Sequence, residues 1–357
     1  MKLSRIRYIA NVFIVILLIA IILFWQSSRE INRAENKVTE TRVSFLAVGD
    51  IMLSRGVANV IERSNNPYHP FEQMKNVFRS TDFNFGNFES PVSGNNEKRA
   101  KGMIFNTHSR NLTGLRVYNF KMLNLANNHA LDQGFQGLQK TRAFLDASKL
   151  EFIGAGGNLE QAWKPKFINV KGVKIAFVGA SYASINDNGT ERNEYVARLD
   201  DKENLKKSIK EARLKGADFI VASMHGGDEY KRNPNKSQID FSRAAIDYGA
   251  DIVIGAHPHW TQIFQQYKGK YIFYSLGNFI FDQSFSRDTT EGLTLKITLN
   301  KRKSASTQTR IEQIELIPVV IENFAPRPAN ETEAQQILQK IGATERIIKP
   351  FNKIPVK

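Results

Sequence analysis

Carboxylate, amide and imidazole side chains recur in this chain directly after short apolar runs. The densest example is Asp251–Asp282, in which Ile252–Ile254 is typical of a buried strand and His257 and His259 follow it on either side of Pro258. Proline favours extended backbone at the residue before it, and side chains two apart in extended backbone point the same way. We therefore expect both imidazoles to reach one point beyond the carboxyl end of a strand, where open α/β sheets place their sites.

A second apolar run lies in the same stretch. Tyr271–Leu276 leads into Gly277 and Asn278, which predicts a hairpin-like unit presenting two imidazoles beside a polar turn. Two loop histidines without a ligand are the alternative interpretation, because short motifs often match by chance.

Four other apolar runs end in residues of the same kinds. Over all five runs these residues are Asp50, then Asn87 and Glu89, then Asn128 and His129, then His225, then His257 and His259. Carboxylate, amide oxygen and imidazole are ligands for borderline and hard divalent ions. Because parallel strands share an edge at their carboxyl ends, the pattern predicts one metal site there.

Each of these residues also has a purely structural explanation. Asp50 could cap a helix, Asn128 and His129 could close a turn, Glu89 could be solvated, and His225 could be a satisfied core histidine. Four of the six histidines follow apolar runs, however, and that concentration favours a joint site over separate coincidences.

The elements that must position these residues alternate between strand and helix signals. Strands are predicted at Val43–Val48, Phe83–Phe85, Phe120–Leu125, Val173–Gly179, Ala217–Ala222 and Ile252–Ile254, and helices at Phe71–Phe78, Leu138–Leu145 and Phe241–Ile246. Repeated strand–helix units imply a largely parallel sheet that is buried on both faces. Leu293–Leu299 and Ile311–Ile321 follow with the period of strands, and Thr332–Ile341 is a short terminal helix.

Composition limits the chemistry. The 357 residues are 41% hydrophobic, enough for one large domain or two smaller ones, and contain no cysteine, which excludes disulfides, zinc–thiolate sites and a cysteine nucleophile. The net charge is +15, which favours a polyanionic partner or an anionic surface, with a merely soluble basic surface as the alternative. We find no Walker-type loop and no nucleic-acid motif, and expect no nucleic-acid partner.

The N-terminus predicts a membrane anchor. Tyr8–Trp25 is nearly all apolar, and its 18 residues can just cross a bilayer core. Lys2, Arg5 and Arg7 precede it, which holds the N-terminus in the cytoplasm, and no clear cleavage site follows. We expect a single-pass protein of the cytoplasmic membrane with its C-terminal domain outside the cytoplasm.

Six motifs carry a family resemblance. In chain order they are GDIMLSRG, GNFESPVS, LANNHALDQG, MHGGDEY, GAHPHW and YSLGNFIFDQ. Over about Val43–Gln283 they resemble the CapA-type poly-γ-glutamate capsule-synthesis proteins, a family that resembles the calcineurin-like metallophosphoesterases. The resemblance implies an α/β, metallophosphoesterase-like layered fold, with β-sheets flanked by helices after one transmembrane helix. The expected domains are a cytoplasmic N-terminus and transmembrane signal anchor at 1–25, a polar linker at 26–42, a CapA/metallophosphoesterase-like domain at 43–325 and a C-terminal extension at 326–357.

The resemblance also implies a two-ion site with divalent cations, of which Mn, Fe, Zn and Mg are all possible. The ligand roles it implies are Asp50 and His259 for one ion, Asn128, His225 and His257 for the other, and Glu89 as the bridge. His129 would act beside the ions as a general acid or oxyanion partner. Candidates for substrate contact or support of the ligands are Arg55, Asp132, Glu229 and Asn278. The phosphoesterase Asp-x-His is Asp50-Ile51-Met52 here, so one ligand of the first ion is lost.

Three functions remain open at this level. The first is a membrane-anchored hydrolase or transferase that processes, exports or retains poly-γ-glutamate, whose polyanionic chain suits the basic body. The second is a non-enzymatic accessory subunit that works with other capsule-synthase subunits and has a vestigial site. The third is a phosphoesterase acting on a small cell-envelope phosphoester, because fold does not choose the substrate.

Overall fold

The computed structural model describes residues 11, 15–26, 39–92, 103–182, 193–303, 308–343 and 353–355. One compact unit comprises Arg42–Asn300 and Thr309–Lys357, and a smaller unit comprises Met1–Thr41 and Lys301–Gln308. In the smaller unit, residues 15–26 form a helix whose large apolar side chains are exposed. Among the residues described, no helix combines the length and the apolar character needed to span a bilayer. The predicted span Tyr8–Trp25 and the linker after it lie partly outside the described residues.

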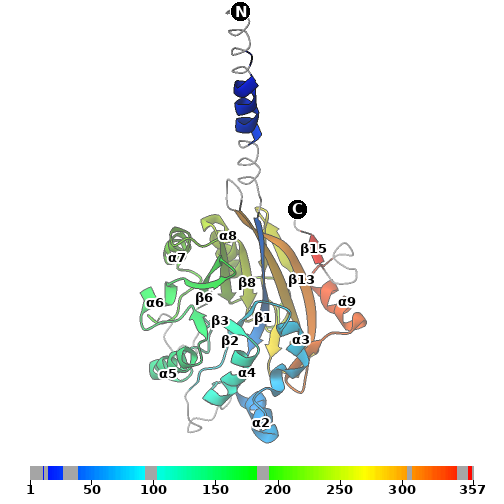
Figure 1. Cartoon of the computed structure of the whole chain (residues 1–357). Helices are drawn as coiled ribbons and strands as arrows, with labels where there is room; N and C mark the ends of the chain where they lie inside the picture. The colour runs from blue at the N-terminus through cyan, green and yellow to red at the C-terminus, as the bar shows by residue number, and fades with distance from the viewer. Residues whose placement is uncertain are drawn as a thin grey trace, which may run out of the picture. The chain divides into compact units, whose positions relative to one another are not determined.

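Two sheets form the centre of the larger unit (Figure 1). The first has the order β14-β13-β12-β1-β2-β3-β4, with β11 on β1 and β15 on β13. Its strands are β1 (Thr39–Ile51), β2 (Phe83–Phe88), β3 (Phe120–Asn124), β4 (Glu151–Ile153), β11 (Asn278–Ile280), β12 (Glu291–Lys303), β13 (Gln308–Glu322), β14 (Ala325–Pro328) and β15 (Lys353–Pro355). The second has the order β5-β6-β7-β8-β10-β9, comprising β5 (Lys166–Val170), β6 (Val173–Ser181), β7 (Phe219–His225), β8 (Ile252–Ala256), β9 (Phe264–Tyr267) and β10 (Lys270–Phe273).

Helices cover the outer face of each sheet. The α-helices are α2 (Arg55–Ser64), α3 (Lys75–Phe78), α4 (Thr113–Val117), α5 (Gly134–Ala147), α6 (Leu159–Trp163), α7 (Lys202–Leu214), α8 (Lys236–Tyr248) and α9 (Glu331–Lys340). The 3₁₀ helices are η1 (His69–Met74), η2 (Ser109–Leu112) and η3 (Asp288–Thr290). Side chains of α2 to α5 join one apolar cluster with the first sheet, and those of α6 to α8 join another with the second.

The central apolar layer explains why the sheets pack face to face. Along β1, Phe45 and Ala47 belong to the cluster between the sheets, whereas Leu46 and Val48 belong to the outer cluster. This is the alternation that a strand imposes on its side chains. Phe45 meets Phe177 of β6 across the interface with ring centroids 6.2 Å apart. Strands buried on both faces, such as β8, are accordingly rich in apolar residues.

Most predicted elements are confirmed, and three predictions are wrong. The protein has two mixed sheets in place of one largely parallel sheet: β13 and β14 pair antiparallel in the first, and β5 and β9 pair antiparallel with their neighbours at the edges of the second. The hairpin-like unit is absent from the described fold, since β8 and β10 pair in parallel after β9 carries the chain to the edge. Phe71–Phe78 is a 3₁₀ turn followed by a single α turn, not one helix.

Candidate metal centre

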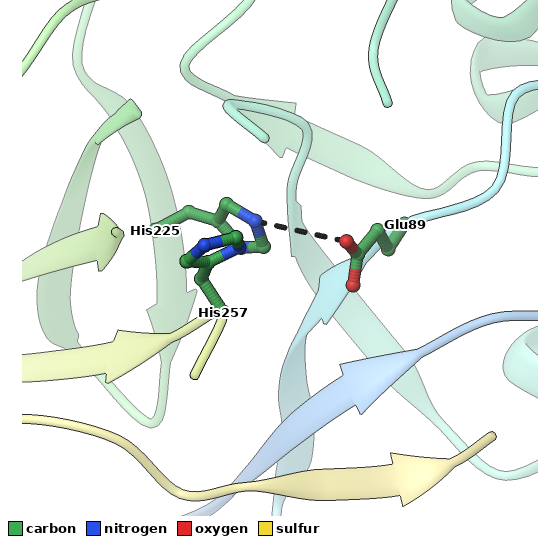
Figure 2. A group of neighbouring side chains, drawn as sticks. All are labelled: Glu89, His225 and His257. Atoms are coloured by element: carbon green, nitrogen blue, oxygen red, sulfur yellow. Dashed lines mark ion pairs between the residues drawn. The ribbon is translucent and has the colours of Figure 1, made fainter. Parts of the chain in front are cut away.

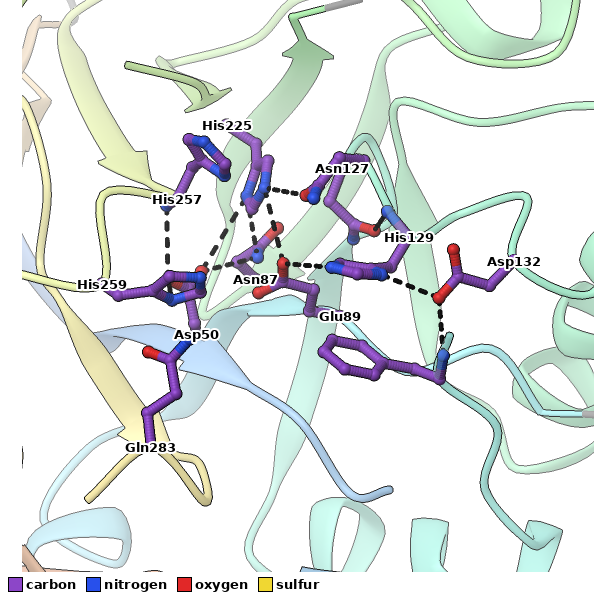
Figure 3. Close-up of polar contacts among 12 residues, drawn as sticks. Asp50, Asn87, Glu89, Asn127, His129, Asp132, His225, His257, His259 and Gln283 are labelled. Carbon is purple, nitrogen blue, oxygen red and sulfur yellow. Dashed lines mark hydrogen bonds and ion pairs between the residues drawn. The ribbon is translucent and has the colours of Figure 1, made fainter. Parts of the chain in front are cut away.

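The structure brings all six predicted ligand residues together at the carboxyl ends of the strands of both sheets. Figure 3 labels all of them except Asn128. The first sheet supplies Asp50 in β1, Glu89 after β2 and Asn128 after β3. The second supplies His225 at the end of β7, and His257 and His259 after β8. All six are buried, with at most 3% of their surface exposed. These residues come together because the edges of both sheets meet here. That they bind ions stays a prediction.

Two glycines allow the strands to approach closely at this edge. A Cβ on Gly49 would lie 1.9 Å from the Gly277 carbonyl oxygen, and one on Gly255 would lie 2.0 Å from that of Tyr274. Any side chain at either position would push a backbone away. Gly49 and Gly255 therefore bring Asp50 and the two-histidine loop within reach of each other.

Two groups of potential ligands share one carboxylate. Glu89, His225 and His257 form the first group (Figure 2), and Asp50, Glu89 and His259 form the second. Within each group, one ligand atom per residue lies within 4.8 Å of the others. Glu89 is the member common to both, which matches the bridging role that the family resemblance implies.

The Glu89 carboxylate has no hydrogen-bond partner among the described residues, although both of its oxygens are buried. Its Oε1 lies 3.7 Å from His225 Nε2 and 3.6 Å from His129 Nε2, too far for hydrogen bonds. The buried Nδ1 of His257 likewise lacks a partner among these residues. Buried polar atoms without partners cost free energy on folding. A cation between the Glu89 carboxylate and the His257 ring nitrogen would satisfy both groups.

Burial and neighbouring charges shift the pKa values of three of these groups away from their ordinary values. Burial raises the pKa of Glu89 well above 4.5, and the neighbouring carboxylates of Asp50, Asp132 and Glu229 raise it further. Burial also lowers the pKa of His225 and of His257 well below 6.5, with the other site histidines adding to the effect. Both imidazoles are thus neutral at pH 7, and burial favours the protonated form of the Glu89 carboxyl group.

A chain of amides fixes the tautomer of His225. Asn124 Nδ2 donates to the Ala126 carbonyl, and the Ala126 amide donates to Asn124 Oδ1, which sets that side chain's orientation. Asn124 Nδ2 also donates to Asn87 Oδ1 at 2.9 Å, so Asn87 Nδ2 faces His225 Nδ1 at 3.1 Å. His225 Nδ1 must then accept, and Nε2 carries the proton that it donates to Asn128 Oδ1 at 2.8 Å.

Asn278 fixes the tautomer of His259 in the opposite sense. Asn278 Nδ2 donates to the Thr289 carbonyl at 2.9 Å, so its Oδ1 faces His259 Nδ1 at 2.9 Å. His259 Nδ1 therefore donates, and its Nε2 keeps a free lone pair. Asp50 Oδ2 lies 3.5 Å from the same Nδ1.

The backbone expected around Pro258 is wrong. His257 has φ +100° and His259 has φ +58°, both in the left-handed region and not extended. The chain turns sharply after β8, and the His257 amide donates to Asp50 Oδ2 at 3.3 Å while the Pro258 carbonyl accepts from the Tyr230 amide at 2.9 Å. As a result the two imidazoles lie 5.9 Å apart between ring centroids and belong to different ligand groups.

His129 stands beside the ligand groups and is held from two sides. Its Nδ1 lies 2.7 Å from Asp132 Oδ2, which also accepts from the Phe105 amide at 2.6 Å. The Phe105 ring stacks on the imidazole with centroids 3.8 Å apart. Burial raises the pKa of Asp132, while its hydrogen bonds with His129 and Phe105 oppose that shift. This arrangement leaves His129 Nε2 directed at Glu89.

The secondary candidates occupy the surroundings of the site. Arg55 forms an ion pair with Asp282, and its guanidinium lies 4.7 Å from the centroid of the Phe105 ring. Burial and the neighbouring Glu229 raise the pKa of Tyr230 to about 12.

Sequence reasoning missed Asn124, although it ends an apolar run as the other site residues do. It also missed Phe105, for which no sequence signal existed.

Met52 stands in place of the histidine of the phosphoesterase Asp-x-His pattern. It is fully buried in the apolar cluster of the first sheet's outer face. Its sulfur accepts from the Ser54 amide at 3.0 Å. The second ligand group therefore has two carboxylates and one imidazole, from Asp50, Glu89 and His259. Residue 52 adds no histidine ligand to it.

The chain is similar to known proteins over most of its length. Residues 44–283 match the family model described as bacterial capsule synthesis protein PGA_cap. The chain is 34% identical over 332 residues to the PGA biosynthesis protein CapA of Bacillus subtilis (strain 168), covering 91% of this chain and 84% of that one. It is 32% identical over 330 residues to the capsule biosynthesis protein CapA of Bacillus anthracis, covering 90% and 78%.

Among solved structures, the calcineurin-like phosphoesterase YfkN of Bacillus subtilis is 15% identical, with a TM-score of 0.40 and coverage of 85% of this chain and 97% of that one. The family model spans more than half of the chain, and both sequence relatives exceed 30% identity over most of their length. The chain belongs to the PGA_cap family of bacterial capsule synthesis proteins.

Proposed function

We propose that this protein acts on or handles poly-γ-glutamate during capsule synthesis, through a metallophosphoesterase-like site for two divalent cations. The observation that carries the proposal is Glu89, whose buried carboxylate lies between two groups of nitrogen and oxygen ligands and has no hydrogen-bond partner among the described residues. The family and the names of two CapA relatives support the capsule context.

The residues that would hold the cations follow from the two groups. Asp50 and His259 would hold one ion, and His225, His257 and Asn128 the other, with Glu89 between them. Mixed carboxylate, amide and imidazole donors suit Mn, Fe, Zn or Mg. When bound, such a cation supplies Lewis-acid chemistry that polarises an amide or phosphoryl oxygen.

His129 is the residue that would move a proton. Its Nε2 faces the site, its Nδ1 is held by Asp132, and the Phe105 ring covers one face. In cleavage or transfer of a γ-glutamyl amide bond, the leaving amine needs a proton, which His129 would deliver from Nε2 as a general acid. A small phosphoester would use the same proton donor, so substrate identity must come from assay.

An accessory role is the second candidate, and Met52 is the observation that favours it. The buried methionine leaves the first ion with fewer ligands than the phosphoesterase pattern would provide. In that case the protein would support other capsule-synthase subunits without turnover.

The N-terminal segment anchors the protein in the cytoplasmic membrane in this proposal. Support comes from the apolar run Tyr8–Trp25 behind three cations and from the exposed apolar side chains of helical residues 15–26. Deleting residues 1–25 should move the protein from the membrane to the aqueous fraction after lysis. Full-length protein in the aqueous fraction would contradict the anchor.

The test of the site combines metal binding with turnover. Metals that bind only the folded state raise its melting temperature, so chelator should lower that of the domain without residues 1–25, and His257→Ala should remove the difference. His69→Ala, a histidine outside the site, is the matched control. The loaded domain is then incubated with poly-γ-glutamate, and chain length is followed. Metal binding without any change in the polymer would leave the accessory role, and absence of metal binding would exclude the two-ion site.

A further inference from the structure

A row of lysines on α7 is an exposed feature that the metal centre does not use. Lys202, Lys206 and Lys210 are all exposed and follow one another at intervals of four residues. Side chains four apart lie on the same face of a helix. The opposite face of α7, which includes Leu205 and Ile209, is buried against the second sheet. The three ammonium groups therefore line one side of the helix, here named the lysine row.

The lysine row has no neutralising partner in ion-pair range within the described part of the chain. At the C-terminal end of α7, Lys215 forms an ion pair with Glu211, and neither residue belongs to the lysine row. Lys206 Nζ lies over the Tyr248 ring, 5.7 Å from its centroid. Lys202 contributes to lowering the pKa of Asp240, but Lys236 is the main cause of that shift and is its ion-pair partner. Part of the excess positive charge of the chain is thus concentrated here.

The row starts at the edge of the sheet where the metal centre lies. Ser181 at the end of β6 is in register with His225 of β7. The next residue, Tyr182, places its ring 4.5 Å from that of His257 and accepts a hydrogen bond from Arg198 Nη1 at 2.7 Å. Arg198 is followed closely by Lys202, the first residue of α7. The lysine row therefore begins a few residues along the chain from a contact of the Tyr182 backbone, next to the site.

We infer that the lysine row binds an extended γ-linked polyglutamate chain and guides it toward the metal centre. The inference rests on the proposed polymer partner. Its physical basis is spacing: four residues of α-helix rise about 6 Å, so the row presents one positive charge per about 6 Å. An α-linked residue with three backbone bonds spans about 3.4 Å, so a γ-linked unit with five spans about 6 Å and carries one carboxylate. The two linear charge densities match.

The alternative anionic partner is a membrane surface, and the helix fits it poorly. Helices that lie in a membrane interface combine a charged face with an exposed apolar face. The apolar face of α7 is occupied by the protein core, and its large exposed hydrophobic side chain is Leu214 at the far end. Charge without exposed apolar surface favours a soluble polyanion.

The experiment measures binding of the domain without residues 1–25 to γ-linked polyglutamate of defined length, at about 50 mM salt, where surface charges are weakly screened. The test variant is Lys202→Gln with Lys206→Gln and Lys210→Gln, since glutamine keeps the helix propensity of lysine. The control is Lys121→Gln with Lys140→Gln and Lys149→Gln, three exposed lysines on the side of the first sheet with the same change in charge. Single exposed contacts contribute little, so the loss for three is expected to be about tenfold in affinity. The control should change affinity less than twofold, and the difference should shrink as salt is raised.

A variant with arginine at the same three positions keeps the charges and should bind with wild-type affinity. All variants should retain the wild-type melting temperature and its shift with metal. Equal weakening by test and control variants would reduce the effect to bulk charge and overturn the inference. Undiminished binding by the test variant would overturn it too. Binding to phosphatidylglycerol vesicles but not to the polymer would assign the row to a membrane. Failure of the wild type to bind the polymer at all would remove the proposed partner as well, whereas loss of the metal shift alone would affect only the metal centre.

Discussion

The Glu89 carboxylate and the His129 imidazole face each other with 3.6 Å between Oε1 and Nε2, without a hydrogen bond joining them. Asp132 holds the other nitrogen of His129 at 2.7 Å. The group shared by both ligand sets and the group best placed to carry a proton are therefore neighbours. Each can be changed separately, which allows metal binding and proton transfer to be tested apart.

Glu89→Gln should have opposite effects with and without metal. The pKa of Glu89 is raised in the folded protein, so its contribution to stability is present below pH 4.5 and is lost as pH rises through the raised value. The metal-free variant cannot ionise there, and its free energy of unfolding should exceed that of the wild type at high pH. Between the unfolded and folded pKa values the difference should grow by about 1.4 kcal/mol per pH unit.

Urea unfolding in chelator between pH 4 and pH 9 measures this difference. Addition of divalent metal should stabilise the wild type and leave Glu89→Gln nearly unchanged, because the shared ligand is gone. Parallel pH profiles for the two metal-free proteins would show that Glu89 does not carry the buried charge.

His129→Gln should separate catalysis from metal binding. The variant loses the proton donor but none of the six ligand residues, so the metal-dependent rise in melting temperature should persist. Turnover of the polymer should fall by about a hundredfold or more, as expected for a lost general acid. Asp132→Asn should reduce turnover less, since it disturbs only the orientation of His129.

Capsule polymer per cell and its length distribution provide the measurement in vivo, at matched protein level and metal content. If both quantities match the wild type in the His129→Gln strain, the proton-transfer role is wrong and the accessory function stands.

Gly255→Ala should destabilise the protein severely and disturb the metal centre. Its Cβ would lie 2.0 Å from the backbone oxygen of Tyr274, so β8 and β10 would have to move apart. We expect little folded protein, or a large fall in melting temperature with loss of the shift caused by metal. Gly216→Ala is the control, because that glycine has φ +78° with open space around it and should cost only about 1 kcal/mol of backbone strain. Similar losses in both variants would mean that close strand approach is not the cause.

Glu333→Gln should lower stability at neutral pH and lose its effect in acid. Arg327 is the main cause that lowers the pKa of Glu333 to about 2, through two hydrogen bonds of 2.8 Å each. A depressed pKa contributes stability above the unfolded value of 4.5 and loses it as pH falls toward 2. Glutamine can still complete the capping box with Asn330 through its amide oxygen, so the variant removes the charge and one of the two acceptors for Arg327.

Thermal unfolding from pH 7 to pH 3 would show a small deficit that closes between pH 4.5 and the acid end. Glu331→Gln, in the same first turn of α9, is the control for charge near the helix N-terminus. A deficit of equal size in both variants would assign the effect to the helix dipole and not to Arg327.

The sequence alone was sufficient for the strands that carry the site residues, because each is a short apolar run that stops at a polar residue. It was also sufficient for the family, since six motifs in fixed order are a far narrower signal than any one of them. The six residues now found together were all identifiable as candidates from their positions after apolar runs. These are local properties, readable over a few residues.

Only the tertiary structure decided how the candidates combine. Asp50, Glu89 and Asn128 come from one sheet and the three histidines from another, and nothing local in the sequence states that the two sheets pack with these edges together. Packing also placed His257 and His259 in different ligand groups, through a turn with positive φ that Pro258 did not predict. Phe105 reached His129 across the fold without any pattern of its own. Such contacts depend on long-range burial and close strand approach, which short-range residue preferences do not encode.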